Sequence, residues 1–230
     1  MTHSHLRHCL LAAVLISSLG PLHRALGAEP TGFYVGANLG EARNDYRTRF
    51  VDDQVEQGAA DANSALEDTK SVVKRNAHAW WVEAGYLPWS QVGFEAAFLH
   101  LAELTHRFSG TVHTPLASLP FISTATVTSA GPALLLLARL PLAGSVELDA
   151  RVGDYLAKTV LKTGFDFHDS YSVDSTSGTK SSLAASLGLA WTVADHWSLR
   201  MDYLRVHRAG DSRTGSYDMD LATAGIAFVF

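Results

Sequence analysis

The sequence predicts an all-β fold, an eight-stranded antiparallel β-barrel that crosses a membrane with its strands. Three observations predict it. Eight segments alternate apolar and polar residues with a period of two, which is the pattern of a strand with one apolar face. The connections between these segments alternate between short and long, as in transmembrane barrels. The sequence of 230 residues also ends on an aromatic side chain, Phe230, with no polar tail after it.

The eight predicted strands are separated by turn signals. They lie at about 33–46, 78–87, 92–108, 125–140, 145–162, 181–193, 197–207 and 217–230. The short connections read PWSQ, PLAG and ADH, and the longest connection, 47–77, is polar and acidic. Short turns at one end and long loops at the other predict a periplasmic and an extracellular side. An even number of strands places both ends of the barrel on the short-turn side.

The last segment, YDMDLATAGIAFVF, shows the alternation most clearly. Phe230, Phe228 and Ile226 fall on one apolar face, and Ala227 and Gly225 fall on a face of small residues. An exposed terminal aromatic is explained if this apolar face meets lipid.

Two short motifs carry a family resemblance. The ending GIAFVF resembles the C-terminal strand of bacterial outer-membrane β-barrels, which typically end in an aromatic residue with apolar residues at alternate positions before it. The segment GFYVGANLG, 32–40, resembles the first strand of the small OmpA-like, opacity-type barrel domain. The resemblance implies a place in the outer membrane and Phe228 and Phe230 as an assembly signal for the barrel-assembly machinery. It also implies contact with outer-membrane lipids and lipopolysaccharide, and an unidentified extracellular ligand at the loops.

The first 28 residues read as a secretory signal peptide. Arg7 and His8 precede an apolar run, 9–19, and small residues follow in RALGA. The run is shorter than the roughly 20 apolar residues of a membrane-spanning helix. We therefore expect a signal peptide at 1–28 and a barrel domain at 29–230, with cleavage after either Gly27 or Ala28. The barrel domain contains no cysteine, and its net charge is more negative than the −5 of the whole sequence, which argues against nucleic acid as a partner.

Charged residues recur on the second face of the middle strands. If this face lines the barrel interior, the lumen, seven charged side chains meet there: Glu83, Glu95, Glu147, Asp149, Arg151, Arg200 and Asp202. An eight-stranded barrel is only wide enough to be filled by side chains, and an unpaired buried charge costs several kcal/mol. The pattern therefore favours a plug of salt bridges over a path for protons or ions, with five acids for two arginines. The run 134–137 is expected to point two further leucines inward.

Aromatic residues gather beside the short turns. Tyr86, Trp89, Trp191 and Trp197, with Phe228 and Phe230, form the predicted aromatic girdle at a membrane interface. A soluble lipocalin-like barrel with its apolar face inward is the alternative. The aromatics at the strand ends, the charges at mid-strand and the terminal aromatic favour the membrane barrel.

Three functions remain open. The leading hypothesis is a structural or surface-interaction barrel with a plugged lumen and specific loops, and the second is a narrow pore. The third is an enzyme that modifies lipid A, as some eight-stranded barrels do. A resemblance to the lipid A deacylase type would require a His-x-Ser arrangement with a Glu later in the sequence. This chain has His168-Asp169-Ser170, but its last glutamate is Glu147. We therefore expect no catalytic residue, and the histidine spacing predicts no metal site and no cofactor.

Deleting Phe230 is expected to lower the amount of folded, membrane-inserted protein, because the closing strand would lose its terminal lipid-facing aromatic. The measurement is the difference in SDS gel migration between unheated and boiled membrane samples. Unchanged amounts of inserted protein would contradict the predicted register of the closing strand.

Overall fold

The computed structural model describes residues 32–44, 49–61, 63–114, 117–167 and 170–230. Contacts divide the chain into Met1–Pro30 and Thr31–Phe230, and every described residue belongs to the second unit. The predicted signal peptide and its cleavage site lie outside the described residues. In the described part of the chain, no helix has the length and apolar character needed to cross a membrane.

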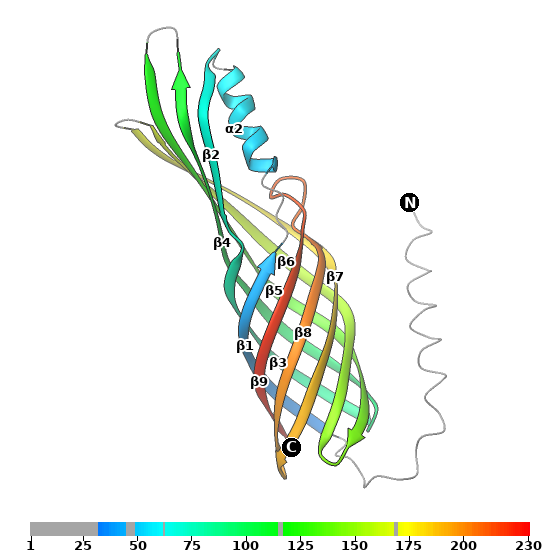
Figure 1. The fold of residues 1–230 in the computed structure, drawn as a ribbon. Helices are drawn as coiled ribbons and strands as arrows, with labels where there is room; N and C mark the ends of the chain where they lie inside the picture. Colours follow the sequence, from blue (N-terminus) through cyan, green and yellow to red (C-terminus); the bar gives the residue numbers. More distant parts are fainter. Residues whose placement is uncertain (1–31, 45–48, 62, 115–116, 168–169) are drawn as a thin grey trace. The chain divides into compact units, whose positions relative to one another are not determined.

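Eight antiparallel strands form a closed ring, which confirms the predicted fold class (Figure 1). The strands are β1(Gly32–Asn44), β3(Asn76–Trp89), β4(Val92–His113), β5(Ser118–Ala143), β6(Val146–Phe167), β7(Ser170–Ala194), β8(Trp197–Ala209) and β9(Tyr217–Val229). The ring closes where β1 pairs with β9, from Tyr34 opposite Val229 to Asn44 opposite Met219. One residue further, the Phe230 N–H donates to the Phe33 carbonyl at 2.9 Å. Closure leaves no free sheet edge in this part of the molecule.

The longest connection is not the loop that we expected. It contains a helix, α2(Arg49–Asp61), and a ninth strand, β2(Ala65–Lys74), outside the ring. β2 pairs with the outer half of β4, from Ala65 opposite His113 to Lys74 opposite Thr105. The abundance of acidic residues made this segment look like a loop. Three of these acids, Asp53, Glu56 and Asp61, lie on the exposed side of an amphipathic helix that buries Val55.

Two further connections expected to be long loops are continuous strands. β4, β5, β6 and β7 have 22, 26, 22 and 25 residues, whereas β1, β3, β8 and β9 have 13 or 14. The long strands run past the end of the ring and, with β2, form an open sheet that we call the extension (Figure 1). Its Ser- and Thr-rich strands have too little apolar alternation to reveal it, although Thr and Val favour strands.

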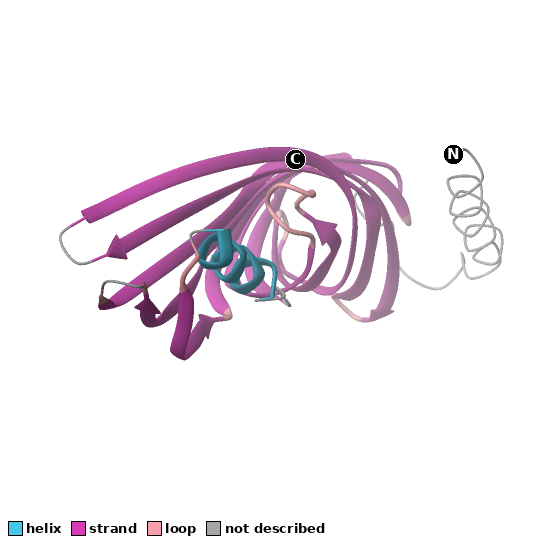
Figure 2. Ribbon diagram, turned by 90° about the horizontal axis from the view of Figure 1, so that it is seen from above, coloured by secondary structure: helices cyan, strands magenta, loops and turns pink. Residues whose placement is uncertain are grey.

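Helix α2 packs on the concave face of the extension (Figure 2). Val55 belongs to a small core with Phe108 and Phe121, whose rings lie 5.7 Å apart. Next to this core, the buried His106 has its Nε2 2.8 Å from Ser71 Oγ and 3.4 Å from Asp52 Oδ1. Burial lowers the pKa of His106, and the nearby Asp52 carboxylate partly offsets this.

Lowering the pH from about 7.5 to about 5 is expected to loosen α2. The pKa of His106 is depressed when α2 is docked, so the undocked segment takes up a proton first. Docking is therefore strongest above the ordinary pKa of about 6.5 and weakens as the pH falls below it. Hydrogen exchange of the α2 amides at the two pH values measures the effect. The His106→Leu variant should show a flatter pH profile, and an unchanged profile would contradict the assignment.

Candidate functional site: the lumen of the barrel

The two faces of the barrel wall carry different chemistry. Along β8, Met201 is 67 % exposed and points outward, whereas the neighbouring Arg200 and Asp202 are 2 % and 5 % exposed and point into the lumen. The same alternation runs through β7, where Leu187 and Leu189 are exposed and Ser186 is buried. Apolar side chains therefore cover the outside of the ring, and polar side chains are enclosed within it.

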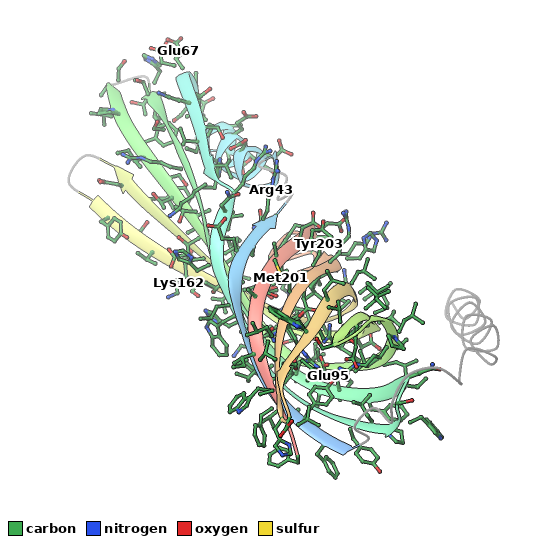
Figure 3. The ribbon with its side chains drawn as sticks, turned by 60° about the horizontal axis from the view of Figure 1, so that its bottom comes forward. Arg43, Glu67, Glu95, Lys162, Met201 and Tyr203 are labelled. Atoms are coloured by element: carbon green, nitrogen blue, oxygen red, sulfur yellow. The ribbon has the colours of Figure 1, made fainter. Side chains whose placement is uncertain are left out.

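All seven residues of the predicted charge network point into the lumen. Six are buried, and the side chain of Glu147 is 13 % exposed near the β5–β6 turn. Glu95 lies inside the ring, whereas Glu67 marks the far end of the extension (Figure 3).

Arg151 connects three strands of the wall. Its Nε donates to Glu95 Oε2 at 3.0 Å, its Nη1 to Asp202 Oδ1 at 2.6 Å and its Nη2 to Asp149 Oδ2 at 3.3 Å. These side chains are almost completely inaccessible to solvent. Charge-assisted hydrogen bonds with several carboxylates offset the desolvation of the guanidinium group.

Arg200 forms a second centre in the same network. It pairs with Glu83, and its Nη2 lies 3.8 Å from Asp149 Oδ2. Its guanidinium carbon also lies 4.7 Å from the centre of the Tyr34 ring, a cation–π contact. The Tyr34 hydroxyl donates to Glu95 Oε2 at 2.6 Å and so links the two arginine centres.

A third arginine, absent from the predicted set, completes the network. Arg139 Nε lies 2.9 Å from Asp149 Oδ1 and 3.1 Å from Glu147 Oε2. The predicted ratio of five acids to two arginines is therefore corrected to five to three. The only sequence signal was positional, because Arg139 lies two residues beyond Leu137 and therefore on the same face of β5. The inward position of Tyr34 could have been read in the same way from GFYVGANLG.

Glycines in the wall leave the space that the charged side chains occupy. Gly36 faces Glu83, and a Cβ atom on Gly36 would lie 2.6 Å from Glu83 Oε1. Gly188 faces Asp202, whose carboxylate fills the place of a side chain there. The network therefore depends on small wall residues as well as on charge pairing.

An apolar layer fills the lumen on the extension side of the network. On β3, Trp81 is the inward residue two positions before Glu83, and on β8 the inward Leu204 and Val206 come after Asp202. The two strands run in opposite directions, so all three side chains lie on the same side of the network. These side chains belong to one buried cluster with Leu99, Leu101, Leu104, Val127, Leu135, Tyr155, Leu161, Tyr217, Met219 and Leu221. Two inward leucines were expected from 134–137, and both are buried, Leu135 in this layer and Leu137 in a separate cluster with Tyr34 and Leu87. The rest of this layer was not anticipated.

Five of the six predicted girdle residues are exposed on the outside of the ring, and Phe228 is half-buried beside neighbouring rings. Tyr86, Trp89, Trp191 and Trp197 lie near the short turns. The ring centroids of Phe33 and Tyr86 are 4.6 Å apart, and Phe228 lies 4.9 Å from Trp197 and 5.2 Å from Phe230. Their placement suits a membrane interface, and their roles in anchoring and assembly stay predictions.

The His-x-Ser segment is only partly described. His168 and Asp169 lie outside the described residues, and Ser170 is the first residue of β7.

A closed ring with an apolar exterior, a filled interior and aromatics at one end defines an integral membrane β-barrel. The family model for the OmpA-like transmembrane domain matches residues 28–230. The chain therefore belongs to the OmpA-like transmembrane domain family, and it is an outer-membrane barrel.

Several solved outer-membrane barrels are similar to this chain. Neisserial surface protein A is 15 % identical with a TM-score of 0.45, and the match covers 87 % of this chain and 98 % of that chain. Ail of Yersinia pestis is 14 % identical with a TM-score of 0.37, and the match covers 86 % of this chain and 100 % of that chain. OprG of Pseudomonas aeruginosa is 15 % identical with a TM-score of 0.40, and the match covers 90 % of this chain and 99 % of that chain. With TM-scores below 0.5, these likenesses support no further conclusion about this chain. A search of the curated proteins found no match.

Replacing Arg151 or Arg200 with alanine is expected to destabilise the barrel by about 3–5 kcal/mol, the usual cost of stranding buried carboxylates. Urea unfolding in lipid vesicles measures the loss. Arg205→Ala is the matched control, because Arg205 is exposed on the outward face of β8 and pairs with Asp218 and Asp220. Equal stability of the Arg151, Arg200 and Arg205 variants would contradict a tightly paired lumen.

Proposed function

We propose that the protein is a non-conducting outer-membrane barrel with a structural or surface-interaction role. The observation that carries this proposal is the stacking of two filled layers in the lumen. Ions would have to pass the network around Arg151 and then the apolar layer around Trp81 and Leu204. A steady open pore would require both layers to rearrange.

The extension is the surface through which we expect the protein to interact. The strands β4–β7 extend well beyond the ring, which a barrel that only spans a membrane does not need. Large apolar side chains are exposed on it, including Tyr171, Val173 and Val72. In the described pairings, β2 joins only β4, and the 170–182 part of β7 joins only β6. These two edges therefore present backbone donors and acceptors to a partner.

We also propose that the protein is not an enzyme. The sequence places no glutamate after His168 and Ser170 that could complete the lipid A deacylase arrangement. Mass spectrometry of lipid A from cells with and without the protein tests this proposal. A change in acylation that disappears in a Ser170→Ala variant would overturn it.

Planar-bilayer recordings of the folded protein are expected to show no steady conductance, because both lumen layers are closed. Vesicles without protein and the boiled protein provide the controls. A stable, ohmic conductance from folded protein, identified by its different migration on SDS gels before and after boiling, would contradict the plugged lumen and favour the narrow pore.

A further inference from the structure

Asp154 is a carboxylate in an apolar environment on the outside of the barrel. It is exposed on the outward face of β6. Its neighbours are Leu134 across on β5, Leu183 across on β7, and Val152 and Leu156 along its own strand. These four side chains are between 40 % and 70 % exposed and belong to the surface that faces lipid. An ionisable group in such a place is unfavourable unless a partner satisfies it.

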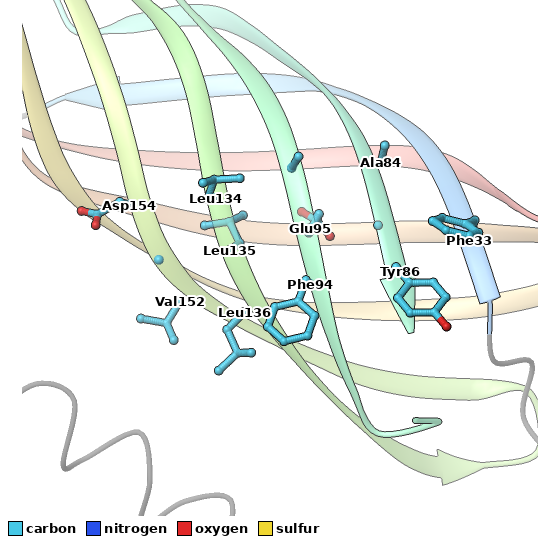
Figure 4. Close-up of a pocket in the computed structure, with 13 residues that line it drawn as sticks. Phe33, Ala84, Tyr86, Phe94, Glu95, Leu134, Leu135, Leu136, Val152 and Asp154 are labelled. Carbon is cyan, nitrogen blue, oxygen red and sulfur yellow. The ribbon is translucent and has the colours of Figure 1, made fainter. Parts of the chain in front are cut away.

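A groove begins at Asp154 and crosses the outer surface toward β1 (Figure 4). Its volume is about 630 Å³, within the range of small-ligand sites. Strand register explains its shape: Ala84, Ala96, Leu134 and Asp154 are successive cross-strand partners from β3 to β6.

The four partners from Ala84 to Asp154 form one row of outward side chains, and the next row on the short-turn side is bulkier. It consists of Tyr86, Phe94, Leu136 and Val152, again in register across the same strands. The two alanines therefore form a depression beside a raised row of large side chains. Glu95 also borders the groove, but its carboxylate points into the lumen and binds Arg151, so the exposed lining is almost entirely apolar apart from Asp154. The groove therefore suits a hydrocarbon chain with one polar group near its end.

We propose that this groove binds one acyl chain of lipopolysaccharide, with a hydroxyl or amide N–H of that chain donating to Asp154. The groove lies within the apolar belt, so lipid is the medium around it. Ser181 Oγ already donates to Asp154 Oδ1 at 2.8 Å, which orients the carboxylate. The acyl chains of lipopolysaccharide carry hydroxyl and amide donors close to the sugar, whereas ester-linked glycerophospholipid chains do not.

The position of Asp154 along β6 supports this choice of lipid. β6 runs from the short turn toward the extension, and Asp154 lies beyond Ala150 and Val152 on the outward face. The carboxylate is therefore on the extracellular side of the belt. Lys158 is exposed two outward positions further along β6, where the phosphate groups of the same lipid would lie. This binding site does not depend on whether the lumen conducts.

Three variants test the proposal against a control. Ala96→Leu fills the depression, Asp154→Leu removes the acceptor, and Asp154→Asn keeps an acceptor oxygen without the charge. Ala224→Leu is the matched control, because Ala224 is an exposed outward alanine on β9 outside the groove. Heat-modifiable migration on SDS gels first establishes that each variant folds.

The measurement is the thermal unfolding midpoint in phosphatidylcholine vesicles as lipid A, phosphatidylethanolamine or phosphatidylglycerol is added. A lipid that binds only the folded barrel raises this midpoint in a saturable way. Lipid A is expected to stabilise the wild type and Ala224→Leu. Its apparent affinity should fall about tenfold in Ala96→Leu and Asp154→Leu, and much less in Asp154→Asn.

Two results would overturn the proposal. Equal responses of all variants to lipid A would show that the lipid acts on the whole belt and not at this groove. A saturable response to phosphatidylethanolamine alone, lost in both Asp154 variants, would identify an ammonium group as the ligand of the carboxylate.

Discussion

The structure depends on the pairing of β1 with β9. Hydrocarbon offers no hydrogen bonds, so the backbone groups of both strands must find partners within the protein, and this pairing supplies them. A ring of eight strands is narrow, and the side chains that point inward must pack against one another. The salt bridges around Arg151, the glycines that make room for them and the apolar layer around Leu204 all follow from that limited space.

The fold could be predicted because its main signal is local. On β8 the outward Leu199, Met201 and Tyr203 alternate with the inward Arg200 and Asp202, and a strand with two different environments must show this pattern. The short turns could also be predicted, since few residue types allow a tight connection between two strands. The charged side chains that meet in the lumen could be assigned for the same reason.

The remaining features depend on contacts that a linear pattern does not encode. Helix α2 is recognisable only when Val55 meets Phe108 and Phe121 on distant strands. The extension has polar residues on both faces, so its strands carry no strong period. Arg139 was missed because the run of leucines before it is apolar on both faces of β5. The groove at Asp154 requires alanines on two neighbouring strands to be in register.

The β6–β7 hairpin has one feature with a consequence for variation. Its pairing is uninterrupted from Val146 opposite Trp191 to Phe167 opposite Ser170, with no bulge. Removing one residue from each strand at the same level flips the side chains beyond the cut to the other face, whereas removing two from each strand restores them. Hairpin length can therefore change in steps of four residues while the lumen stays the same. Descendants of this chain could present surfaces of different height above one unchanged membrane anchor.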